Sequence, residues 1–146
     1  MTEKRPKEDG MKLRFNNKRY KEGMRERADV MGDLFKKLYK HLKNRGFDVY
    51  AIGQHEGLCR APYVVVRERG EQPFLTGLVA KWVDFMAIVP EGHYSELGGY
   101  IADLRAALKD YAGLRDTHIM TPPVIDPYVK GYTVNLTYQI IARRMG

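Results

Sequence analysis

Residues 132–140 read Tyr-Thr-Val-Asn-Leu-Thr-Tyr-Gln-Ile, and this stretch carries the clearest structural pattern in the chain. Aromatic or aliphatic side chains alternate strictly with Thr, Asn and Gln, so an extended segment would have one apolar and one polar face. A period of two is typical of a strand in an antiparallel sheet that has only one face covered by a core. The pattern therefore predicts a sheet with helices packed against one side.

Three further strands are expected upstream, over residues 47–52, 63–68 and 81–89. The second follows Ala61-Pro62 and contains the consecutive valines Val64, Val65 and Val66. Three valines in a row suit a strand covered on both faces, or one that lies at a subunit contact. Residues 69–73 predict a turn, and residues 74–80, which are apolar but interrupted by glycine, fit neither a helix nor a strand.

Two helices are expected. The first follows from apolar residues that recur at spacings of three and four, and Gly46 is placed to end it in the left-handed conformation. The second runs from Ser95, a predicted N-cap, to Tyr111. Gly98-Gly99, early in that helix, indicates close packing or a bend, and residues 117–128, with three prolines, predict an extended connection. The apolar stripe of the first helix consists of Met24, Ala28, Met31, Phe35, Leu38 and Leu42, with Leu34 beside it.

The order of these elements, α-β-β-β-α-β, defines an α+β fold with a mainly antiparallel sheet and two helices packed on one face. With 146 residues, the chain has the size of one domain. We expect a flexible basic leader over residues 1–17 and a single α+β domain over residues 18–146.

Charge and composition limit the classes of protein to which this chain can belong. The net charge is +7, and the residues up to Ala28 carry +5 of it, from ten basic and five acidic side chains. No apolar run approaches the roughly 18 residues that suggest a membrane span. Cys59 is the only cysteine, so no disulfide forms within the chain, and a reducing compartment is expected.

The sequence contains few residues that could form a catalytic or metal-binding site. Only His55 and Cys59, four residues apart, resemble a metal-binding or nucleophile–base pair, and one His and one Cys fall short of the four ligands usual for zinc. The glycines match neither of the common phosphate-binding loops. We therefore predict no catalytic, cofactor-binding or metal-binding residues, no cofactor, and a protein that is not an enzyme.

The ten tyrosines and the basic segment leave two interpretations open. Aromatic residues in strands are more often core or contact surface than platforms for stacked bases, and tyrosine is favoured at protein interfaces. No helix-turn-helix, zinc-finger or RNA-binding signature is present. An interface protein is the first interpretation, and a nucleic-acid-binding accessory protein that uses its basic N-terminal segment is the alternative.

Several segments together resemble the neck and connector proteins of tailed bacteriophages and related contractile particles, in particular the tail terminator group. They are residues 27–35 (RADVMGDLF), 49–57 (VYAIGQHEG), 62–66 (PYVVV), the helix of residues 94–110, and residues 138–144 (YQIIARR).

The resemblance implies a structural virion subunit without catalytic residues, assembled in the host cytoplasm. Such subunits form a homo-oligomeric ring, usually a hexamer, that caps the tail tube and meets the head connector protein. The expected partners are therefore other copies of the chain, the tail tube protein and the connector, with no membrane and at most weak nucleic-acid binding. Val64, Val65 and Val66 are the candidate subunit-contact strand.

Overall fold

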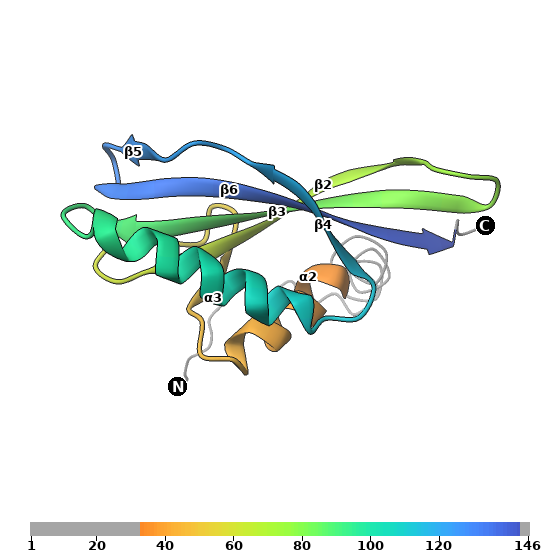
Figure 1. Ribbon diagram of the computed structural model, residues 1–146, viewed down its shortest axis with the longest axis horizontal. Helices are drawn as coiled ribbons and strands as arrows, with labels where there is room; N and C mark the ends of the chain where they lie inside the picture. The colour runs from red at the N-terminus through yellow and green to blue at the C-terminus, as the bar shows by residue number, and fades with distance from the viewer. Residues whose placement is uncertain (1–32, 144–146) are drawn as a thin grey trace, which may run out of the picture. The chain divides into compact units, whose positions relative to one another are not determined.

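A computed structural model describes residues 33–143. The leader predicted over residues 1–17, the domain start at residue 18 and the first part of the first helix lie outside the described residues. Within them the predicted fold class is confirmed: two α-helices pack on one side of a six-stranded, mostly antiparallel sheet (Figure 1). The elements, in chain order, are α2 (Asp33–Lys43), β1 (Val49–Ala51), β2 (Tyr63–Pro73), β3 (Leu78–Pro90), the 3₁₀ helix η2 (Tyr94–Glu96), α3 (Leu97–Lys109), β4 (Leu114–Met120), β5 (Val124–Asp126) and β6 (Gly131–Arg143).

The strands lie in the order β1-β2-β3-β6-β4, and β5 also pairs with β6. Only β1 and β2 are parallel; the other pairs are antiparallel. β3 and β6 form the centre and pair along their whole length, from Leu78 opposite Arg143 to Pro90 opposite Gly131. The other strands of the sheet pair with one or other side of this long central pair.

The core lies between the sheet and the two helices. The alternation in the last strand is confirmed for its apolar positions, since Val134, Leu136 and Tyr138 are buried on the helix-covered face, but Thr137 and Gln139 of the polar face are buried as well. The predicted helical stripe is confirmed where it is described, since Leu38 and Leu42 of α2 are fully buried. Gly46 adopts the predicted left-handed conformation, with φ 90°, and the N–H of Phe47 bonds to the carbonyl of Leu42 to close the helix end. The fully buried side chains of the sheet and of α3 include Val83, Phe85, Val89, Leu104 and Leu108.

The turn predicted at residues 69–73 is wrong. β2 continues to Pro73, and the chain turns at residues 74–77 before β3 begins at Leu78. Beyond residue 66 the outer edge of β2 faces no other described strand. Polar residues and a proline fit such an edge, because the outward-facing backbone needs no partner there. A β-bulge between Glu68 and Gly70 further obscures the period of two.

The extended connection predicted at residues 117–128 is also wrong, because it contains the end of β4 and all of β5. The register of β4 against β6 shifts between Asp116 and Ile119, and His118 within that shift has a left-handed φ of 64°. A bulge moves successive side chains out of simple alternation, so no strand pattern is visible in the sequence.

The second helix differs from its prediction at the N-terminus. Ser95 lies inside η2 and does not cap α3, whose N-cap is Glu96 without a side-chain hydrogen bond. The expectation of close packing at Gly98-Gly99 is wrong, since a Cβ at either position would meet no atom within 4 Å. These glycines therefore weaken the helix without making room for a neighbour.

Replacing Gly99 by alanine should stabilise the protein by about 0.5–1 kcal/mol, because alanine loses less backbone entropy in a helix. Urea denaturation followed by circular dichroism measures the change. Gly113→Ala is the matched control: its φ of +87° strains any residue with a Cβ, so this variant should be less stable than the original chain. A destabilised Gly99→Ala variant would contradict the prediction.

Candidate functional site

The predicted contact strand lies in β2, between β1 on one edge and β3 on the other. Val64 and Val66 are 0% and 2% exposed and face the helix-covered side. Val65 is half-buried on the opposite face, beside the small cluster formed by Cys59, Tyr63 and Ile88. The side chains of Val64 and Val66 therefore belong to the core, and only Val65 has surface to offer. The subunit contact proposed for this strand stays a prediction.

One end of the sheet extends past both described helices. This extension, the arm, consists of residues 69–82 and 139–143 and runs to the right in Figure 1. At its tip the turn is closed by hydrogen bonds between Phe74 and Leu78 and between Leu78 and Leu75. Phe74 and Leu75 are 46% and 61% exposed. The arm therefore presents two large apolar side chains at its tip.

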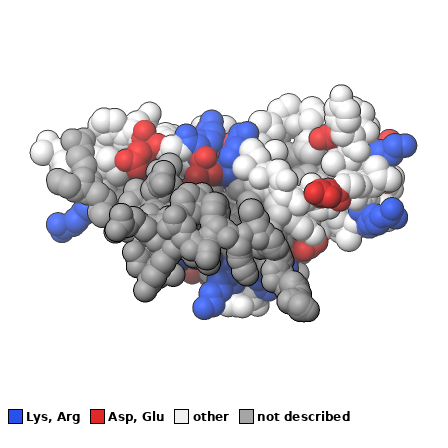
Figure 2. Space-filling view, turned by 180° about the vertical axis from the view of Figure 1, so that it is seen from behind, with Lys and Arg blue, Asp and Glu red and all other residues white. Residues whose placement is uncertain are grey.

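The part of the sheet away from the arm, from the middle of β6 to its first residues, carries a second set of exposed apolar side chains. We call it the β4–β5 patch, and it consists of Ile119, Met120, Val124, Ile125 and Tyr128, each about half exposed or more. Consecutive side chains within each strand point to opposite faces of the sheet, so the patch wraps around its edge. β5 pairs with the first residues of β6, from Gly131 to Thr133, whereas the last residues of β6 belong to the arm. Figure 2 shows a largely uncharged surface at its upper right, over the end of the sheet where Figure 1 places β5.

The base of the arm is held by a buried carboxylate. Asp84 of β3 is 0% exposed although it points away from the helices. Arg67 Nη2 lies 2.5 Å and Arg69 Nε 3.2 Å from Asp84 Oδ2, and the hydroxyl of Thr137 donates to Oδ1 at 3.1 Å. Because Arg69 lies in the bulge of β2, these contacts fix the irregular position from which the arm projects.

His55 and Cys59, the only pair in the sequence that resembled a metal-binding or nucleophile–base pair, have different partners in the structure. The Cys59 thiol is buried and bonds to the carbonyl of Ala61, and burial raises the pKa of that thiol. The His55 ring stacks on the Tyr63 ring with centroids 4.0 Å apart, not on the sulfur. Among residues 33–143, no group of three or more His, Cys, Asp or Glu side chains is placed to hold a metal ion.

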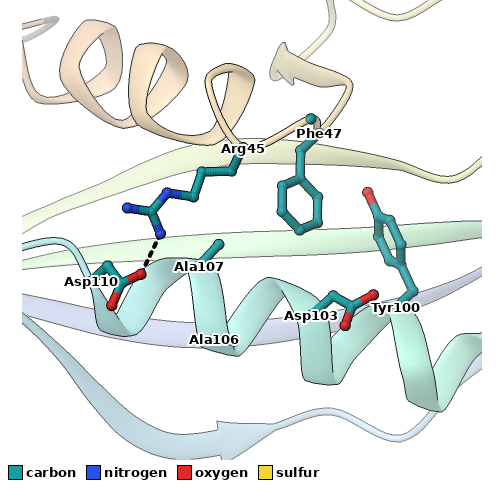
Figure 3. A pocket seen from close by; sticks show the side chains of 8 residues that line it. Arg45, Phe47, Tyr100, Asp103, Ala106, Ala107 and Asp110 are labelled. Carbon is teal, nitrogen blue, oxygen red and sulfur yellow. Dashed lines mark hydrogen bonds and ion pairs between the residues drawn. The ribbon is translucent and has the colours of Figure 1, made fainter.

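A shallow groove of about 470 Å³ lies between the end of α2 and the outer face of α3 (Figure 3). At one end Arg45 and Asp110 form an ion pair, and at the other the Phe47 ring meets the Tyr100 ring edge-on at 5.7 Å. Burial raises the pKa of Tyr100 above its usual value, and its hydroxyl has no hydrogen-bond partner within residues 33–143. The groove lies between residues that follow α2 and residues of α3. No local sequence pattern predicted it, because these residues are far apart in the sequence and come together only on folding.

The chain matches no protein-family model and no curated protein. No helix of the described part is both long and apolar enough to cross a membrane. The function proposed below therefore rests on the surfaces and charges of the described residues and on the sequence resemblance.

Proposed function

We propose that this chain is a structural subunit that joins copies of itself head to tail in a closed ring at the top of a phage-type tail. The observation that carries the proposal is the pair of unlike apolar surfaces on one sheet: the tip of the arm, and the β4–β5 patch, which runs from the middle of β6 to the end away from the arm. β6 connects them, and its 13 residues separate the two ends by about 40 Å.

Two different surfaces on one sheet favour a heterologous contact, in which one copy's first surface meets the next copy's second. Such a contact repeated by rotation closes into a ring, whereas a two-fold dimer needs one self-complementary surface. Exposed apolar groups gathered in patches are typical of interaction sites. The outer edge of β2 in the arm, which pairs with no other strand within residues 33–143, also offers backbone groups to a neighbour.

The place of the ring rests on the sequence resemblance to tail terminator proteins, with six copies as the expected number. In that position one face of the ring meets the tail tube protein and the other meets the head connector protein, within the virion. The absence of a catalytic role follows the same resemblance, and the described surfaces suit an assembly role.

Two variants test the head-to-tail contact. Leu75→Asp places a charge on the arm tip, and Val124→Asp places one on the β4–β5 patch, so each variant alone should be monomeric. Mixed in equal amounts, they retain one intact contact per pair and should form dimers that grow no further. Ile52→Asp is the control, because Ile52 is 60% exposed and lies on neither surface; it should leave assembly unchanged.

Analytical ultracentrifugation measures the species, and negative-stain electron microscopy shows whether the unmodified chain forms rings. Rings that survive both charge substitutions, or mixed variants that assemble into full rings, would contradict the head-to-tail contact. A chain that stays monomeric at its highest soluble concentration and is missing from purified tail particles would overturn the proposed function itself.

A further inference from the structure

A second cavity, of about 400 Å³, lies between α3 and β4 on the helix-covered side of the sheet. Its volume falls within the range of about 300–1,000 Å³ typical of small-molecule sites. One wall is apolar, and two positively charged side chains of α3 line part of the rest. The lining residues are Arg105, Ala106, Lys109, Leu114, Asp116, His118 and Tyr138.

The two cations come from the same face of α3. Arg105 and Lys109 are four residues apart, so their side chains lie one turn apart along the helix. Within residues 33–143, Lys109 has no hydrogen bond or ion pair, and the Arg105 guanidinium donates only to the sulfur of Met120, at 3.8 Å. The Nε of Arg105 is buried without a partner in the same part of the chain. Both side chains therefore keep N–H donors that no group within residues 33–143 uses.

The one acid in the cavity does not neutralise them. Asp116 Oδ1 accepts the backbone N–H of His118 at 2.7 Å, and Oδ2 accepts the hydroxyl of Tyr138 at 3.4 Å. The nearest guanidinium nitrogen of Arg105 is 3.7 Å from Oδ2, an ion pair without a hydrogen bond. Asp116 therefore holds the backbone at His118 and the hydroxyl of Tyr138, and the two cations of α3 exceed its charge by one.

We propose that this cavity binds a small molecule through an oxyanion group, either a phosphate or a carboxylate, with Arg105 and Lys109 as the binding residues. Guanidinium and ammonium groups make the strongest protein hydrogen bonds to such oxygens. Ala106, Leu114 and the ring of Tyr138 supply apolar surface for the rest of the ligand. Arg105 contacts Met120 of the β4–β5 patch, but no residue that lines the cavity belongs to the arm or to that patch, so Lys109→Met tests anion binding separately from ring assembly.

Titration with inorganic phosphate and, separately, with acetate tests the proposal by ¹⁵N NMR at constant ionic strength. One of the two anions should give saturable shifts at the amides of Arg105, Lys109 and His118, and the anion that binds identifies the oxyanion. Lys109→Met should weaken this binding about tenfold, because it removes one charge-assisted contact and keeps the apolar stem. Arg105→Gln should weaken it at least as much.

Arg115→Gln is the matched control. Arg115 is exposed and precedes Asp116 on β4, so its side chain points to the opposite face of the sheet, and its loss removes the same charge. It should leave the affinity unchanged. Lys109→Met alone decides the test if Arg105→Gln does not fold. Shifts that do not saturate with either anion, or an affinity lowered equally by Arg115→Gln and Lys109→Met, would overturn the proposal.

Discussion

Leu38→Asp should leave the protein unfolded. Leu38 is 0% exposed in the middle of α2, and the substitution would bury an unpaired carboxylate against the sheet. The cost is several kcal/mol, close to the total stability of about 5–15 kcal/mol of a typical domain. Circular dichroism and the dispersion of amide resonances would report the loss of structure.

Leu75→Asp is the matched control for this substitution. It makes the same chemical change at a leucine that is 61% exposed at the arm tip, so the variant should still fold and unfold cooperatively even where it no longer assembles. A Leu38→Asp variant that unfolds with a normal cooperative transition at nearly the original temperature would show that α2 contributes little to the core.

Asp84→Ala should lower the free energy of unfolding by about 2–3 kcal/mol. It removes a fully buried carboxylate that accepts a hydrogen bond from Thr137 and pairs with the guanidinium groups of Arg67 and Arg69. Losing one partner of a buried pair normally costs about 3–5 kcal/mol, and the partial exposure of both arginines reduces that penalty. Urea denaturation measures the change.

The same substitution should loosen the arm before the rest of the sheet. Backbone amides of residues 69–82 should exchange faster with solvent, while those at the β3–β6 centre keep their protection. Asp103→Ala is the control: Asp103 is exposed and has no ion pair within residues 33–143, so stability should change by less than about 0.5 kcal/mol. Equal effects of the two substitutions would show that Asp84 does not hold the arm.

The parts of the fold that could be predicted are those where one face is buried and the other is not. The alternation over residues 132–140 predicted β6, and the stripe through Leu38 and Leu42 predicted α2, because burial imposes a period on the sequence. The valines of β2 were predicted as a strand because β-branched residues favour strands. Gly46 ended its helix as expected, since the left-handed conformation favours glycine.

The parts that could not be predicted are set by contacts between distant residues. β2 continues through a polar stretch because it stays paired with β3. β4 could not be recognised in the sequence because the bulge after Asp116 interrupts its alternation. The pairing of Asp84 with Arg67 joins two strands, and the cavity beside Arg105 joins a helix to a strand. The apolar residues of the β4–β5 patch were visible in the sequence, but their exposure was not.

The position of β6 in the sheet has a consequence for synthesis. β6 lies beside β3 at the centre, yet about 40 residues of chain, including α3, separate the two strands along the sequence. During translation β3 emerges long before its partner and keeps one edge and one apolar face uncovered. Such an edge can pair with other nascent chains, so slow elongation between the two strands should favour aggregation over folding.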